Sequence, residues 1–392
     1  MKTMKWKFYS LAFVAGMSIL TACSSDDNND NDGNGGNGNG NEIENGTILK
    51  GTITSDVTLA AGNTYKLSGE YIVEEGATLH IEEGVKIIAV YDDIADYILV
   101  KQGGKINAVG TPDKPIVMTS EKEEPGAWGG IHICGRAHTN AEGGKGSSEI
   151  GGAVYGGNDD ADNSGTLQYI RLEYTGFAFD EEHEANGISF YGVGNGTIVD
   201  HCQAYKGSDD GFEFFGGSVN VSNLVAVSCS DDSFDWTEGW NGKGTNLVAY
   251  QEAESTLGYD CDCLMECDNN GSNNATPVAH PVLKNLILVG NGGSKQGIRL
   301  RAGTEVEIDN AKVCGKGQPL TVETALTENA LKNGTSKLTN ITLTSELSSK
   351  EGIYTHADFI AVTSNKVDAN LSYSSFEDIR KECSWMNGNW VK

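Results

Sequence analysis

The sequence predicts an all-β solenoid, a parallel β-helix with a short C-terminal capping segment. Two observations lead to this prediction. Glycine makes up 51 of the 392 residues without a Gly-X-Y period, which is typical of a turn-rich β protein. Short strands of alternating polarity also recur along most of the chain. Because such short units cannot bury their apolar faces alone, they must stack on one another.

Residues 1–22 have the pattern of a secretory signal. Three lysines precede an apolar run over residues 11–20 that is too short to span a membrane. Residues 20–23 resemble the lipobox of bacterial lipoproteins. That resemblance implies that Cys23 is acylated and becomes the mature N-terminus. We therefore expect contact with the membrane only through the lipid on Cys23.

Residues 23–45 are rich in Asn, Asp and Gly, and no apolar residue occurs before Ile43. Such a segment is expected to be a flexible tether. The acidic residues directly after Cys23 resemble the surface-export signal of Bacteroidetes lipoproteins, which implies an outer-membrane protein that faces the cell exterior. A plain solvated linker remains the alternative.

The balance of charge narrows the choice of partners. The chain has 28 Lys and Arg against 55 Asp and Glu, a formal net charge of −27. No basic stripe offsets this charge. Because polyanions are repelled by such a surface, we expect neither nucleic acid nor anionic lipid headgroups as partners.

Two interleaved strand families form the expected solenoid. Segments of the first family start at Asp200, Asn223, Asn246, Asn285, Asn310 and Asn340, and a copy without Asn starts at Tyr169. Segments of the second family start at Gly187, Gly211, Ser233, Cys263, Gly297 and Pro319. Because an amide both donates and accepts hydrogen bonds, the repeated Asn side chains are expected to stack as a ladder.

The strand pattern continues upstream, over residues 76–120, and ends in Trp128-Gly-Gly-Ile. With the Asn ladder, it resembles right-handed parallel β-helix lipoproteins of Bacteroidetes, relatives in fold of the pectin lyases. The resemblance implies a right-handed β-helix over residues 46–350. It implies no single function, because this fold carries lyases, hydrolases and adhesins.

Residues 351–392 break the repeat. A serine opens an expected helix over residues 374–383. We predict that this segment caps the open end of the solenoid, with Trp385 and Trp390 on the last coil.

Strand alternation assigns faces to the second family. The expected interior pairs are Ile188/Phe190, Phe212/Phe214, Phe234/Trp236, Leu264/Glu266, Ile298/Leu300 and Leu320/Val322. The opposite face then carries what we call the acidic strip: Asp209, Asp210, Glu213, Asp231, Asp232 and Asp235. Phe215 is expected beside the strip, and Arg299 and Arg301 two coils further on.

Three interpretations of the acidic strip remain open. The Asp residues can form turns that bond their own backbone. Asp209, Asp210, Asp231 and Asp232 can act as oxygen ligands for Ca²⁺. In an enzyme, catalysis would use Asp210, Asp232, Asp235 and Arg299. The arrangement is similar to that of polygalacturonases, but it lacks a Gly-His-Gly element and a base placed as in pectate lyases.

Two further patterns suggest metal sites or cross-links. Asp160 and Asp162 open a loop with Ca²⁺-ligand spacing, but Arg171 at its twelfth position excludes an EF-hand; an ordinary polar turn is the alternative.

Eight cysteines remain once Cys23 is acylated, and in an exported protein they are expected to form disulfides. Cys261, Cys263 and Cys267 are the alternative zinc ligands.

Aromatic residues near the strip favour a sugar ligand. Tyr191, Phe215, Trp240, Tyr250 and Tyr259 are expected at the surface, where aromatic faces stack on sugar rings. Packing beneath inserted loops is the alternative for them. The expected edge contacts are Glu213, Arg299 and Arg301.

The sequence thus predicts a lipid-anchored surface protein that binds an extracellular glycan or host surface without cleaving it. Ca²⁺ is the one cofactor expected. A polysaccharide hydrolase or lyase acting on an acidic polysaccharide is one alternative, and a purely structural surface protein is another.

Overall fold

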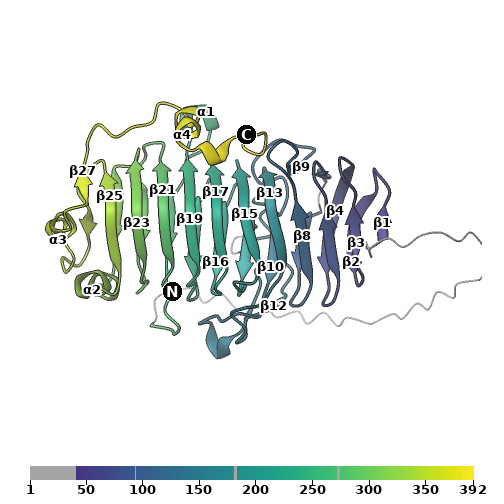
Figure 1. The fold of residues 1–392 in the computed structure, drawn as a ribbon, viewed down its shortest axis with the longest axis horizontal. Coiled ribbons are helices and arrows are strands. Elements are labelled where there is room, and N and C mark those ends of the chain that lie inside the picture. Colours follow the sequence, from purple (N-terminus) through teal and green to yellow (C-terminus); the bar gives the residue numbers. More distant parts are fainter. Residues whose placement is uncertain (1–40, 93, 181–182, 272–273) are drawn as a thin grey trace, which may run out of the picture. The chain divides into compact units, whose positions relative to one another are not determined.

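The computed structural model describes residues 41–392 except 93, 181–182 and 272–273. Its strands form successive coils, and each strand pairs in parallel with the equivalent strand of the next coil (Figure 1). The predicted all-β parallel β-helix is therefore confirmed. Strand pairing begins at residue 41, inside the predicted tether, and continues to residue 367, past the predicted limit of 350. The predicted signal peptide and Cys23 lie outside the described residues.

The early coils contain short strands in three rows. The first row is β1 (Asn41–Ile43), β3 (Val57–Leu59), β5 (Thr78–Ile81) and β8 (Lys105–Val109). The second is β2 (Ile48–Ile53), β4 (Thr64–Val73), β6 (Lys86–Ala89) and β9 (Ile116–Ser120). The third continues from β4 into β7 (Tyr97–Val100), β10 (Ile131–Cys134), β14 (Ile188–Tyr191), β16 (Phe212–Phe215), β18 (Phe234–Thr237), β20 (Met265–Cys267), β22 (Gln296–Leu300), β24 (Gln318–Val322) and β26 (Ser348–Ser349).

The first two rows merge at β13 (Gly165–Glu173), which pairs with both β8 and β9. The merged strands after it are β15 (Ile198–Tyr205), β17 (Asn220–Val227), β19 (Lys243–Tyr250), β21 (Val282–Val289), β23 (Glu307–Cys314), β25 (Lys337–Leu343) and β27 (Lys366–Val367). Most of them contain one residue of positive φ that the pairing skips, such as Asn246 with φ 60°. Asn tolerates this left-handed conformation better than most residues, which explains why it recurs there.

The predicted Asn ladder is confirmed from Asn223 to Asn310, whereas Asn340 donates to Asp309 instead. Nδ2 of Asn246 donates to Oδ1 of Asn223 over 2.8 Å, and Asn285 and Asn310 repeat the bond to the coil before at 3.0 and 2.8 Å. The start of the ladder differs from the prediction, because His201 rather than Asp200 takes the skipped position. Asp200 instead accepts a hydrogen bond from Nδ2 of Asn223 over 2.7 Å.

Stacked aromatic rings form much of the interior. Phe190 stacks on Phe214 with 5.0 Å between ring centroids, and Phe212 on Phe234 with 5.6 Å. The predicted inward column is therefore confirmed at these positions. Trp240, expected at the surface, lies in the same core, 1 % exposed and stacked on Phe214 at 4.1 Å.

One residue of the predicted column is wrong. Glu266 pairs with Asp235 and Arg299 on the outer face, whereas Leu264, Met265 and Cys267 belong to the core cluster. The strand begins only at Met265, after a long insertion, and a shift of one residue exchanges the two faces of a strand.

The expectation of disulfides is wrong for this structure. All eight cysteines in the described part of the chain are free and buried. Cys202, Cys229 and Cys267 lie in the core cluster as small apolar side chains. The alternative zinc ligands, Cys261, Cys263 and Cys267, do not form one of the potential ligand groups found among the described residues.

The open end is covered by α2 (Ala325–Asn333) and α3 (His356–Ala361), whose Leu331 and Phe359 join the core. The predicted helix exists as α4 (Phe376–Glu382), but it does not cap this end. Residues 371–392, which we call the strap, run back along β23 to β13 (Figure 1).

The strap corrects the predicted contacts of two tryptophans. Trp390 lies against Tyr169 and His201 on β13 and β15, and Trp385 lies against Trp390. Neither packs on the last coil as predicted. An apolar stripe on the outer faces of the merged strands, including Val225, Val248 and Ile287, is buried by the strap and explains its position.

The insertions add few further elements. The hairpin of β11 (Gly146–Ser147) and β12 (Val154–Tyr155) and a 3₁₀ turn at Glu142–Gly144 lie in the insertion after β10. Helix α1 (Glu254–Leu257) follows β19, and a second 3₁₀ turn spans Ser384–Met386. None of the helices in the described ranges is long and apolar enough to cross a membrane.

We predict that the aromatic column sets the stability of the fold. Phe212→Ala should lower the free energy of unfolding by about 3–5 kcal/mol, because it leaves a cavity between Ile188 and Phe234. The measurement is urea unfolding followed by circular dichroism. Ile198→Ala is the control, since Ile198 is 54 % exposed and should change stability by less than about 0.5 kcal/mol. Equal losses in the two variants would contradict the assigned interior.

Candidate functional site

The outer face of the third strand row brings the predicted acidic strip together. Glu213 of β16 pairs with Asp235 of β18, Asp235 with Glu266 of β20, and Glu266 with Arg299 of β22. Parallel pairing in register points these side chains to the same side. The strip therefore continues through Glu266 to the two arginines.

A second acidic column lies where the chain enters these strands. The N–H of Asp210 donates to Oδ1 of Asn186 over 3.2 Å, and the N–H of Asp232 donates to Oδ1 of Asp210 over 2.8 Å. The N–H of Cys263 in turn donates to Oδ1 of Asp232 over 2.6 Å. One oxygen of each aspartate thus fastens its coil to the next, and both side chains are more than nine-tenths buried.

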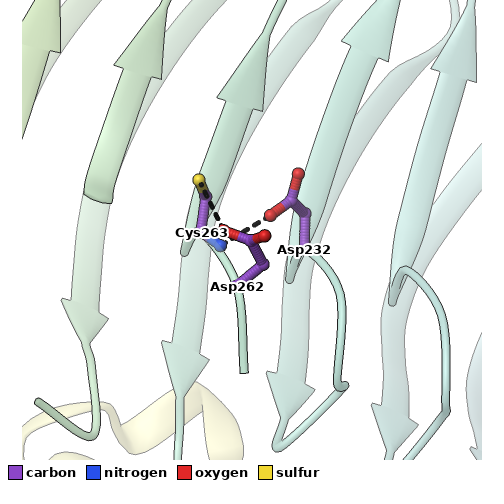
Figure 2. A group of neighbouring side chains, drawn as sticks. All are labelled: Asp232, Asp262 and Cys263. Carbon is purple, nitrogen blue, oxygen red and sulfur yellow. Dashed lines mark hydrogen bonds between the residues drawn. The ribbon is translucent and has the colours of Figure 1, made fainter. Parts of the chain in front are cut away.

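Carboxyl oxygens of the two columns lie within 4.8 Å of one another in three overlapping groups. These groups are Asp209, Asp210 and Asp231; Asp210, Glu213 and Asp235; and Asp232, Asp235 and Glu266. A fourth group joins Asp232, Asp262 and the thiol of Cys263, which donates to Asp262 over 3.4 Å (Figure 2). Of the predicted metal ligands, Asp209, Asp210 and Asp231 share one group and Asp232 belongs to two others, so the metal site stays a prediction.

The crowding raises pKa values throughout the strip. Burial, and then the Asp231 carboxylate, raises the pKa of Asp209 to about 7. Burial, and then Asp262, raises the pKa of Asp231 to about 6. Burial first and neighbouring carboxylates second raise the pKa of Asp210, Glu213, Asp232 and Asp235 well above the ordinary range. Protons or a cation must therefore compensate this charge.

Some of the acids have partners. Nδ2 of Asn186 donates to Oε2 of Glu213 over 2.5 Å. Lys295 pairs with Asp262. Oδ1 of Asp235 is buried and has no hydrogen-bond partner within the described ranges. Asp235 is therefore the residue of the strip with the most evident need for an added positive charge.

The arginines are held by acids at the end of the strip. Arg299 pairs with Glu266 over 2.7 Å and with Glu323 over 3.4 Å, and Arg301 pairs with Asp268 over 2.6 Å. Partial burial lowers the pKa of Arg299, but the Glu323 and Glu266 carboxylates outweigh it, and the pKa is raised. The Arg299 guanidinium is therefore held between Glu266 and Glu323.

A hollow of about 420 Å³ opens at this end. Arg301, Asp268 and Glu323 line it with charge, and Asn274 and Thr324 with neutral polar groups. The side chain of Leu326, 51 % exposed, adds an apolar surface. The hollow therefore offers hydrogen-bonding groups around a small apolar platform.

Two aromatic residues predicted to face a ligand are buried. Tyr191 is 0 % exposed and stacks on Phe215 at 4.4 Å, and Phe215 is 7 % exposed. The insertion after β10 covers them, with Tyr155 lying 5.2 Å from Tyr191 between ring centroids. Packing beneath an inserted loop, the alternative interpretation, is correct for this pair.

Tyr250 and Tyr259 are half-buried. Tyr250 lies against Phe376 of the strap, and the hydroxyl of Tyr259 donates to the carbonyl of Ser228 over 2.8 Å. Both rings therefore contribute to packing around the merged strands.

The carboxylates of the Asp160 loop are engaged by backbone. Asp160 accepts the N–H of His138 over 3.1 Å and its Nδ1 over 2.6 Å, and Asp162 accepts the N–H of Arg136 over 3.0 Å. The groups of potential ligands found among the described residues do not include this loop. These bonds hold the loop against residues 136–138, and Ca²⁺ binding at Asp160 and Asp162 stays a prediction.

Several site residues were missed from the sequence. Glu266 was assigned to the interior, although a charge inside an apolar column was a signal of a register error. Asp268, Asp262 and Asn186 lie in or beside insertions that interrupt the repeat. Glu149, whose pKa burial raises to about 7, comes from the insertion after β10 and has no signal in the repeat.

The fold and the strip define a class of protein, a parallel β-helix with a charged outer face. The chain matches the model of the family described as pectate-lyase like beta helix domain over residues 51–391, and it therefore belongs to this family. Comparisons with curated proteins and with solved structures give no match. Membership of this family explains the fold, but it does not specify an activity.

We predict that the strip gives stability an unusual dependence on pH. A carboxyl whose pKa is higher in the folded than in the unfolded state stabilises the fold while protonated. The melting temperature should therefore fall as the pH rises through the values of about 6 and 7 of Asp231 and Asp209. Asp210→Asn should raise the melting temperature above neutrality and flatten the slope, because Asn186 already fills the equivalent position with an amide.

Asp358→Asn is the control for this series of thermal melts. Lys332 lowers the pKa of Asp358 to about 2, so its charge stabilises the fold. This variant should not gain stability above neutrality. An Asp210→Asn protein that melts below the native protein there would contradict the repulsion argument.

Proposed function

We propose that this chain is a lipid-anchored protein of the bacterial outer surface that binds an extracellular glycan without cleaving it. The hollow beside Arg301 is the observation that carries the proposal. Sugars present hydroxyl edges and apolar C–H faces, so a ring of charged and neutral polar groups around Leu326 is complementary to them. Arg301 lines the hollow, and the N–H groups that its pairs with Asp268 and Glu266 do not use can donate to the hydroxyl or carboxylate oxygens of an acidic sugar or a host-surface glycan.

The geometry of the acids supports binding over cleavage. Glycosidases use two carboxyl groups with separate roles, one protonated and one ionised. Asp210 and Asp232 are buried, and one oxygen of each is held by the backbone of the next coil. Arg299 is held by two carboxylates. A polysaccharide hydrolase or lyase is therefore the less favoured alternative.

A hard divalent cation such as Ca²⁺ fits the strip as a cofactor. The three carboxylate groups supply only oxygen ligands, which Ca²⁺ prefers. Asp235, whose Oδ1 has no hydrogen-bond partner among the described residues, belongs to two of these groups. A cation there would also bring positive charge to the surface that an acidic glycan approaches.

Glycan binding is tested on an array with the chain from residue 41 onward, which contains all the described elements. Hits are then measured by calorimetry. Arg301→Gln should weaken binding at least about tenfold, because a charge-assisted hydrogen bond is lost. Arg136→Gln is the matched control, since Arg136 pairs with Glu75 outside the hollow.

The same measurements separate the alternatives. Release of shortened or unsaturated sugars would establish the hydrolase or lyase, and the absence of any ligand would leave a structural surface protein. Thermal melts in excess Ca²⁺ and in chelator test the cation, because a ligand of the folded state raises the melting temperature. If Ca²⁺ still raises the melting temperature of the Asp232→Asn protein, the cation binds elsewhere.

We predict that the anchor depends on Cys23. Cys23→Ser should move the protein from the membrane fraction to the soluble fraction, because the acylated thiol is the one attachment that the sequence provides. Immunoblots of fractionated cells measure the change, with Cys383→Ser as the control. Unchanged membrane retention of the Cys23→Ser protein would refute the lipid anchor.

A further inference from the structure

A second hollow, of about 190 Å³, lies between the strap and the Asn ladder. It belongs to the merged strands β19, β21 and β23, and not to the strand row that carries the acidic strip. The polar and aromatic residues that line it include Asn246, Asn285, Asn310, Lys312, Glu382 and Trp385. The two hollows therefore share no residue and can be tested separately.

The ladder leaves hydrogen-bonding capacity toward this hollow. Each amide nitrogen has two hydrogens and each amide oxygen two lone pairs. Each bond of the ladder, from Asn310 to Asn285 and from Asn285 to Asn246, uses one amide hydrogen of the donor and one lone pair of the acceptor. The second donor and the second lone pair are not used by the ladder, and Asn285 and Asn310 are exposed. Donors and acceptors thus repeat at the coil spacing of about 4.8 Å.

The strap supplies the remaining walls. The half-buried ring of Trp385 rests against Trp390, with 6.2 Å between the ring centroids. Lys312 and Glu382 form an ion pair at the rim, and Tyr373 donates to Glu382 over 2.8 Å. Because the two charges neutralise each other, the hollow carries no net attraction for an ionic ligand.

We propose that this hollow binds a single neutral sugar ring. An aromatic ring offers a platform for the apolar C–H face of a sugar, and a row of amides offers partners for its hydroxyl groups. The hollow is smaller than the roughly 300–1,000 Å³ of pockets for drug-sized ligands, so it admits one ring rather than an oligosaccharide. The protein then has a neutral subsite on one sheet in addition to the charged strip on another.

The experiment titrates the purified full chain with glucose, galactose, mannose and N-acetylglucosamine and follows saturation-transfer NMR and tryptophan fluorescence. At least one sugar should bind saturably. Trp385→Ala should weaken that binding about tenfold through the lost platform. Asn310→Gly should also weaken it, and because glycine accepts the φ of 64° at this position, the variant tests the amide without backbone strain.

Asn340→Gly is the matched control. Asn340 has the same positive φ of 57°, but its amide bonds to Asp309, and it does not line this hollow. This variant and Arg301→Gln should bind the sugar like the native chain. Binding that survives both Trp385→Ala and Asn310→Gly would overturn the proposal, as would saturable binding of none of the four sugars. Loss only in Arg301→Gln would assign the sugar to the strip instead.

Discussion

Parallel coils place every side chain beside the equivalent side chain of the next coil, at the strand spacing of about 4.8 Å. Each position must therefore be occupied by a residue that tolerates its own kind as a neighbour. Phenylalanine meets this condition by stacking, as Phe190 does on Phe214. Asparagine meets it because its amide donates on one side and accepts on the other, as from Asn285 to Asn246. The core and the ladder are two results of this single constraint.

Carboxylates cannot meet the condition by themselves, since each repels the next. The strip shows three local remedies. Asp210 and Asp232 accept backbone N–H groups of the following coil. The amide of Asn186 donates a hydrogen bond to Glu213. The guanidinium groups of Arg299 and Arg301 form ion pairs with Glu266. Asp235 lies between these partners with one oxygen unpaired, so an added cation would stabilise the fold most at that point.

The same constraint explains what could be predicted from the sequence. The inward apolar residues and the ladder recur over successive coils, so alternation and spacing identified them. Glu266 was placed on the wrong face because an insertion precedes its strand and hides where pairing resumes. Tyr191 occupies an outward position but is buried, because the insertion after β10 folds over it. Insertions do not repeat along the chain, so the contacts that they make could not be predicted from the repeat pattern.

The position of the strap also follows from the stacking of equivalent side chains. Outward positions of the merged strands carry valine and isoleucine in register, an apolar stripe that stacks well but would be exposed to water. Residues such as Met386 and Trp390 return along the coils to cover it, and Lys392 pairs with Glu173 of β13. Apolar stacking on one sheet thus requires a cover, while acidic stacking on another requires positive charge. The two outer faces therefore differ in chemistry, although they are built from the same coils.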